Sequence, residues 1–154
     1  MASIIYMTDF AEAYARGLLL GIARYAERVG EAWNICRLPL SIRDRFGIKA
    51  VVEYAYTHHA DAVIGQFNPQ DDVSLFTKQG ILVLAQDFKS PFTDIPNICG
   101  EYCKSGEMAA DYFINKGFRN FGFYGVKHVN WSEDRRKGFL DVISSKVPGY
   151  SFYD

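Results

Sequence analysis

The sequence lacks a long hydrophobic run and an excess of charge of either sign. Its longest apolar runs are far shorter than the ~20 residues that a membrane-spanning helix needs, so we expect no membrane contact. A basic start followed by an apolar stretch and a small-residue cleavage site, as in a secretory leader, does not occur. The 17 basic and 18 acidic residues are spread along the chain without a basic block, which predicts that another segment makes any contact with DNA.

Cysteine and histidine are scarce, with three of each. An odd number of cysteines at low density (Cys36, Cys99 and Cys103) is typical of free thiols in a reducing compartment, and it predicts a cytoplasmic protein. His58 and His59 are neighbours near a predicted helix end, where adjacent side chains diverge and rarely chelate one ion together. We therefore expect neither a metal ion nor a cofactor.

The glycine pattern of a nucleotide-binding site is also missing. A dinucleotide-binding fold needs glycines in the turn after its first strand, and here that turn is "TDFAEAY". Gly17 and Gly21 come two helical turns later, where we interpret them as positions that let a helix approach the sheet closely. The chain has no P-loop and no serine in a nucleophile elbow. The predicted third strand ends in Gln66 and Phe67 and not in the aspartate of a phosphoacceptor domain, so we expect no enzyme.

Continuous apolar runs and helical periodicities alternate along the chain. The apolar runs predict buried strands at residues 4–7, 62–67, 81–86 and 121–126, with weaker candidates at 33–38 and 97–102. Helical spacing predicts helices over 13–30, 41–59, 71–79 and 104–116, and a last helix with Ser132 as its N-cap. Alternating strands and helices of this kind predict an α/β fold with a doubly wound parallel sheet.

Polar or aromatic residues follow three of the predicted strands. Asp9 and Phe10 follow the first strand, Gln66 and Phe67 the third, and Asp87 the fourth. Ligands of open α/β sheets bind at the carboxyl ends of the strands. Carboxylates, amides and aromatic faces suit a neutral polyol, because they accept hydroxyl protons and cover its CH face. Since loops are polar in most proteins, the chemistry alone leaves a ligand site and ordinary loops equally open.

Three longer segments resemble a known family. They are "AYARGLLLGIARYAERVG" (13–30), "MAADYFINKGFRNFGFYG" (108–125) and "NWSEDRRKGF" (130–139), and they are similar to the sugar-sensing domain of xylose-operon regulators of the AraC/XylR type. That family is similar in turn to the lac-repressor and periplasmic sugar-binding proteins. The resemblance implies a type I periplasmic-binding-protein fold, in which two lobes hold a sugar between them. The first lobe would be residues 1–103, and residues 104–154 would begin a second lobe that is truncated.

The resemblance also implies site residues and partners. It places Asp9, Phe10, Tyr14, Gln66, Phe67, Asp87, Glu101, Trp131 and Arg135 at the ligand, a pentose or related sugar. Arg135, three residues before a helix glycine, would bond vicinal hydroxyls, and Trp131 would supply a stacking wall. In such regulators a separate C-terminal helix-turn-helix domain binds DNA. A solute-binding component of a sugar transport system is the alternative. Because the strand at 121–126 would lack sheet partners, we expect a homodimer, with exchange of the C-terminal segment as one route.

Overall fold

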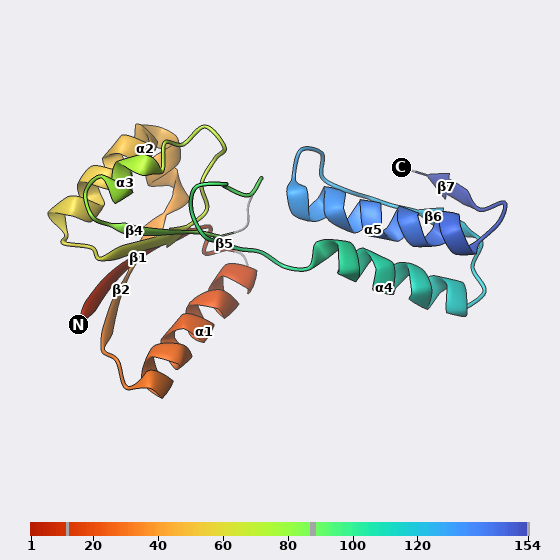
Figure 1. Ribbon diagram of the computed structural model, residues 1–154, viewed down its shortest axis with the longest axis horizontal. Helices are drawn as coiled ribbons and strands as arrows, with labels where there is room; N and C mark the ends of the chain where they lie inside the picture. Colours follow the sequence, from red (N-terminus) through yellow and green to blue (C-terminus); the bar gives the residue numbers. More distant parts are fainter. Residues whose placement is uncertain (12, 87–88, 154) are drawn as a thin grey trace. The chain divides into compact units, whose positions relative to one another are not determined.

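The computed structural model describes residues 1–11, 13–86 and 89–153. The chain divides into two compact units (Figure 1). Unit 1 comprises Met1–Gln86 and Pro91–Ile98, and unit 2 comprises Asp87–Ser90 and Cys99–Asp154. The division of the chain into lobes at residue 103 stays a prediction.

Unit 1 is built on a five-stranded parallel sheet. Its strands, in the order β2-β1-β3-β4-β5, are β1 (Ala2–Thr8), β2 (Trp33–Pro39), β3 (Ala62–Gly65), β4 (Leu82–Gln86) and β5 (Asn97–Ile98). The continuous apolar runs form these strands because the sheet is covered on both faces, and β1 is buried from Ile4 to Thr8. The prediction of a parallel α/β sheet is confirmed.

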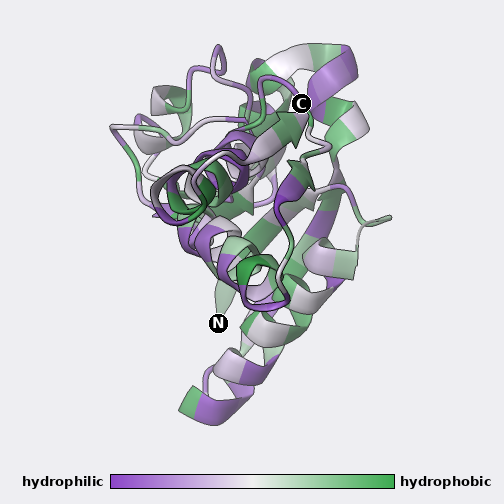
Figure 2. Ribbon diagram, turned by 90° about the vertical axis from the view of Figure 1, so that its right-hand side faces the viewer, coloured by the Kyte–Doolittle hydropathy of each residue, from purple (hydrophilic) through white to green (hydrophobic). Residues whose placement is uncertain are grey.

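Helices cover both faces of the unit 1 sheet (Figure 1). The first helix, α1 (Ala13–Val29), lies on one face, while α2 (Leu40–Thr57) and the short α3 (Ser74–Thr77) lie on the other. The side chains of β1 alternate between the two faces of the sheet. Ile4 and Tyr6 belong to the α1-face cluster, which includes Leu18, Leu19 and Ile22 of α1. Ile5 and Met7 belong to the α2-face core, which includes Val51 and Ala55 of α2. Figure 2 shows the hydrophobic character of these strands and the mixed character of the helices around them.

The two glycines of α1 do not contact the sheet, so the packing role predicted for them is wrong. Gly17 and Gly21 are exposed, and a Cβ atom added to either would meet no atom within 4 Å. The helix packs through the opposite side, formed by Ala15, Leu18, Leu19, Ile22 and Ala26. A helical repeat of 3.6 residues explains the error, because positions 17 and 21 are nearly opposite positions 15, 19 and 26.

Several element boundaries also differ from the prediction. The second helix kinks at Gly47, whose φ of 78° and ψ of 172° are non-helical. The third helix is limited to Ser74–Thr77, and the strand expected at 97–102 ends at Ile98. Glycine is suited to the kink because its missing Cβ permits a positive φ.

Unit 2 contains α4 (Tyr102–Asn115), β6 (Asn120–Gly122), α5 (Asn130–Lys146) and β7 (Ser151–Tyr153). Strands β6 and β7 pair in parallel. The strand predicted at 121–126 is therefore present as β6, but it is shorter than expected, and its partner β7 was not predicted. A small core lies between the strands and helices, formed by Ala110, Phe121, Phe139, Ile143 and Val147. Among the described residues, no helix is both long and apolar enough to cross a membrane.

The start of α5 differs from the prediction. The helix begins at Asn130 after Val129, so Ser132 lies in its first turn and is not the N-cap. The Ser132 hydroxyl instead accepts a hydrogen bond from the Val126 backbone N–H, at 2.9 Å. Ser132 therefore holds the loop that precedes the helix, a role that a short polar side chain performs as readily as capping.

Candidate ligand-binding site

The order of the unit 1 strands defines a candidate binding edge. The chain passes from β1 to β2 on one side and then to β3 on the other side of β1. The segments that follow β1 and β3 therefore separate at the carboxyl edge, which is where open α/β sheets bind ligands. Asp9 and Phe10 follow β1, and Gln66 and Phe67 follow β3, so both predicted pairs lie at this switch point.

The segment after β1 presents one exposed carboxylate and two partly exposed aromatic rings. Asp9 is exposed, and its Oδ1 accepts a hydrogen bond from the Ala11 N–H at 2.9 Å. The Phe10 ring packs edge-to-face on Tyr6, with centroids 5.6 Å apart, and the Arg37 guanidinium lies 4.9 Å from its centroid. Tyr14, in the first turn of α1, is 48% exposed. These three predicted residues therefore lie on one loop and helix start.

The two predicted residues after β3 lie on opposite faces of the sheet. Gln66 is buried on the α1 face, two residues after Ile64. Phe67 is 1% exposed in the α2-face core, where its ring contacts Phe76 and Phe92 edge-to-face. Its aromatic face is thus covered by the core of unit 1, and Phe67 supports the edge without offering a stacking surface. Asp87 lies outside the described residues.

A buried arginine that was not predicted holds the segment after β3. The Arg43 side chain is 3% exposed, and its guanidinium donates to the carbonyl oxygen of Gln66. It also donates to Asp44 Oδ1, at 2.7 and 3.0 Å, and lies 3.9 Å from Asp71 Oδ2. Asp71 in turn accepts the Asn68 N–H at 2.7 Å. Arg43 therefore ties the start of α2 to both ends of this segment, which no short sequence pattern indicates.

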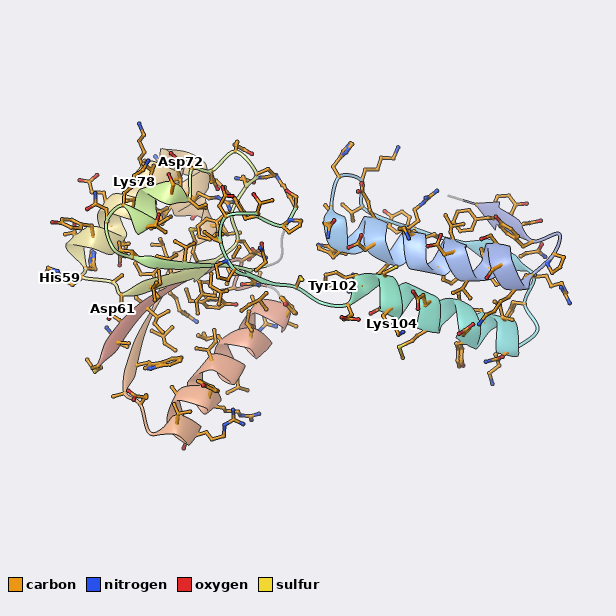
Figure 3. All side chains as sticks on the ribbon, viewed as in Figure 1. His59, Asp61, Asp72, Lys78, Tyr102 and Lys104 are labelled. Atoms are coloured by element: carbon orange, nitrogen blue, oxygen red, sulfur yellow. The ribbon has the colours of Figure 1, made fainter. Side chains whose placement is uncertain are left out.

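In unit 2, the structure brings Trp131 and Arg135 together. The Arg135 guanidinium carbon lies 5.3 Å from the Trp131 ring centroid and 4.4 Å from that of Tyr102 (labelled in Figure 3). Such cation–π contacts orient the planar guanidinium, whose five N–H donors lie in the plane of the group. Tyr102 was missed by the sequence analysis, although an aromatic residue opening a helix is a detectable signal. Glu101 is exposed at the start of α4.

A cavity of about 710 Å³ lies at the carboxyl end of β6. It is lined by residues 123–127 and by Ser132, Glu133 and Arg136 from the first two turns of α5. The Glu133 carboxylate accepts the His128 N–H at 2.9 Å, so α5 also fixes the loop that borders the cavity. Trp131 and Arg135 are not among the lining residues, and this cavity was not predicted.

Neither unit offers a metal site within the described part of the chain. No three His, Cys, Asp or Glu side chains there lie close enough together to hold a metal ion. The candidate residues of unit 1 are thus the exposed carboxylate of Asp9, the aromatic rings of Phe10 and Tyr14, and the buried amide of Gln66, and those of unit 2 are the exposed carboxylate of Glu101, the Trp131 ring and the oriented Arg135 guanidinium.

Comparison with solved structures identifies the fold. The structure matches a periplasmic binding protein/LacI transcriptional regulator from Alkaliphilus metalliredigens, complexed with D-xylulofuranose, at a TM-score of 0.73 and 21% identity over 100% of this chain and 56% of that one. It matches a periplasmic solute-binding protein from Actinobacillus succinogenes, with bound D-allose, at 0.80 and 15% identity over 99% and 58%. A third match is the transcription regulator CcpA of Lactococcus lactis, at 0.71 and 12% identity over 99% and 59%.

The chain thus has the fold of type I periplasmic binding proteins and LacI-like regulators, as predicted. It spans less than two thirds of the length of each neighbour. No protein-family model and no curated protein sequence matches the chain. At identities of 12–21%, the neighbours establish the architecture and leave the ligand to be argued from the site.

Proposed function

We propose that the chain is the sugar-binding effector domain of a bacterial transcription regulator, of the AraC/XylR type, that controls the use of a pentose or related sugar. The protein binds and does not catalyse, and a separate C-terminal helix-turn-helix domain contacts DNA. Sugar binding changes the balance between two conformations of the protein and thereby acts on that domain. Two neighbours support the ligand class, because their structures hold D-xylulofuranose and D-allose.

The observation that carries the proposal is the orientation of Arg135. Its guanidinium lies against two aromatic rings, Tyr102 and Trp131, on a helix that is packed in unit 2. A guanidinium held in this way presents two parallel donors to neighbouring acceptors, a geometry that suits vicinal hydroxyl oxygens. The adjacent rings supply apolar surface of the kind that covers a sugar's CH face.

A solute-binding component of a sugar transporter is the second candidate, favoured by the fold of the Actinobacillus neighbour. The cysteines support the regulator. Cys36, Cys99 and Cys103 are all free thiols, and Cys99 is exposed. Free and exposed thiols are typical of proteins in a reducing compartment, whereas transporter components work in an oxidising one.

The proposal is tested by measuring sugar binding to the full-length protein by calorimetry, with pentoses, hexoses and uronic acids as ligands. For the best sugar we expect Arg135→Ala to raise Kd roughly 10- to 100-fold, which corresponds to about 1.5–3 kcal/mol for hydrogen bonds from a charged donor. Arg135→Lys keeps the charge but loses the paired donors, so we expect a similar loss. Asp9→Ala tests the unit 1 edge in the same assay.

Lys137→Ala is the matched control, because Lys137 is a 68% exposed cation on the same helix that pairs with Asp141. We expect it to leave Kd unchanged. Binding of no sugar by the wild-type protein would contradict the proposed ligand class. Unchanged affinity in both Arg135→Ala and Asp9→Ala would contradict the assigned residues.

A further inference from the structure

Three polar side chains form a row at the carboxyl edge of the unit 1 sheet. Thr8 ends β1, Gln86 ends β4, and Gln66 directly follows β3 between them. The strand register pairs Met7 with Gly65 and Gly65 with Ala85, so the next residue on each strand falls in one row. The Gln66 N–H donates to the Met7 carbonyl at 2.9 Å, which extends the pairing to this row.

All three side chains point to the α1 face. Side chains alternate along a strand, and Tyr6, Ile64 and Leu84, each two residues earlier, belong to the α1-face cluster. The row is also shielded from solvent, with Thr8 exposed by 0%, Gln86 by 2% and Gln66 by 5%.

Four polar atoms of this row form no hydrogen bond of good geometry in the described part of the chain, although the Thr8 and Gln86 side chains lie near the Tyr6 hydroxyl. They are Thr8 Oγ1, Gln66 Oε1, and both Oε1 and Nε2 of Gln86. A buried polar atom without a partner costs free energy comparable with a lost hydrogen bond, and native proteins seldom retain one. Four of them in adjacent positions indicate a group that the described part of the chain does not supply.

The surroundings define what that group is. Tyr6 lies directly before the row, is fully buried, and donates from its hydroxyl to the Ala15 carbonyl oxygen at 3.1 Å. The four atoms are two amide oxygens that accept, one amide nitrogen that donates and one hydroxyl that can do either, and none of the three side chains is charged. An occupant that satisfies both kinds of atom must donate as well as accept, and a neutral one avoids the cost of burying an unpaired charge.

We propose that Thr8, Gln66 and Gln86 form a buried binding site for an uncharged hydroxyl group, supplied by ordered water or by a hydroxyl of the bound ligand. Buried waters commonly make about three hydrogen bonds to polar atoms that lack other partners, which one or two waters achieve with this row. The ligand source depends on the proposed sugar-binding function, whereas the water source does not.

The test uses two substitutions that remove polar atoms and retain shape, Thr8→Val and Gln86→Met, in the full-length protein. Thermal unfolding is measured without sugar, and the affinity for the best sugar is measured by calorimetry. If water occupies the site, both variants unfold about 3–5 °C below the wild type without sugar, because each loses hydrogen bonds. If a sugar hydroxyl occupies the site, both variants bind the sugar about 10-fold more weakly.

Thr77→Val is the control, because the exposed Thr77 hydroxyl already donates to the Ser74 carbonyl at 3.0 Å, and we expect little change. Either expected effect, or both together, supports the site. A melting temperature that is unchanged or raised in both variants, with unchanged sugar affinity, overturns it, since removing unpaired polar atoms would then be neutral or favourable. If the wild type binds no sugar, the proposed function fails, and the melting temperatures alone still decide the hydroxyl site.

Discussion

Two glycines in unit 2 allow α4 and α5 to pack with their backbones in contact. A Cβ atom added at Gly106 would lie 2.1 Å from the Arg135 carbonyl oxygen, and one added at Gly138 would lie 2.0 Å from the Cys103 carbonyl oxygen. Both distances are more than an ångström shorter than an ordinary contact. Since the obstructing atoms are helix backbone, a side-chain rotation cannot relieve the clash, and the two helices must separate.

The cost of adding one methyl group follows from two opposing effects. Overpacking a tight contact typically costs about 1–3 kcal/mol, and the backbone obstruction places Gly106→Ala near the upper end. Alanine recovers up to about 1 kcal/mol through its higher helix propensity. We therefore expect Gly106→Ala and Gly138→Ala each to lower the free energy of unfolding by about 1–2 kcal/mol. The double variant should cost less than the sum, because one separation relieves both clashes.

Urea denaturation followed by circular dichroism measures these changes. Gly17→Ala is the matched control, because it is also a mid-helix glycine but has no atom within 4 Å of the added Cβ. That variant should be more stable than the wild type, by up to about 1 kcal/mol. Stabilisation by Gly106→Ala and Gly138→Ala of the same size as in the control would refute the close packing of α4 on α5. Fully additive costs would refute the shared crossing point.

Two further predictions concern unit 1. Burial raises the pKa of Tyr6 to about 12 from 10.0, although the nearby Thr8 and Gln86 side chains act to lower that pKa. The neutral form of Tyr6 is therefore favoured in the folded state. The resulting stability is present below pH 10, and up to about 2–3 kcal/mol of the free energy of unfolding is lost as the pH rises from 10 to 12. Denaturation at several pH values should show that Tyr6→Phe loses less stability at alkaline pH than the wild type. An equal loss in both proteins would contradict the prediction. Arg43→Met should lower the free energy of unfolding by about 2–3 kcal/mol, because it removes a charged donor from the Gln66 carbonyl. Asp44→Asn is the control, because the Asp44 side chain is 56% exposed, and it should lower the free energy of unfolding by less than about 1 kcal/mol. Equal losses in the two variants would contradict the role of Arg43.

The sheet of unit 1 was predictable because its signal is local. Parallel strands buried on both faces are continuous apolar runs, and residues 4–7, 62–67 and 81–86 have that form. Helix ends were predictable at Gly30 and Gly117, where the positive φ of 70° and 83° favours glycine. The strand β7 was not predictable from its own residues, because three residues carry no periodicity and the strand depends on its pairing with β6.

The orientation of helices was harder to predict than their existence. Tyr14, Leu18, Ile22 and Tyr25 are spaced as one face of α1, but Tyr14 and Tyr25 are 48% and 47% exposed. An apolar stripe wider than the buried face leaves the rotation of the helix undetermined, since aromatic residues also occupy the rim. The same ambiguity explains why the sequence indicates Gly17 and Gly21 of α1 as packing glycines, whereas the glycines in close contact lie in α4 and α5.

The positions of the candidate site residues were most predictable where they follow from topology alone. Asp9, Phe10 and Gln66 lie at the carboxyl edge because every strand of a parallel sheet ends there. Whether a residue at this edge faces a ligand or the core depends on its parity along the strand, and one position separates Gln66 on the α1 face from Phe67 in the opposite core.

The alternation of side chains along a strand also explains why the buried row of Thr8, Gln66 and Gln86 is not indicated by the pattern of polar loops. Thr8 and Gln86 are the last residues of their strands, and at those positions a sheet covered on both faces normally carries apolar side chains. A threonine and a glutamine there disfavour folding unless their polar atoms are satisfied. Their presence at the carboxyl edge, where open α/β sheets bind ligands, therefore supports the hydroxyl-binding site proposed for Thr8, Gln66 and Gln86.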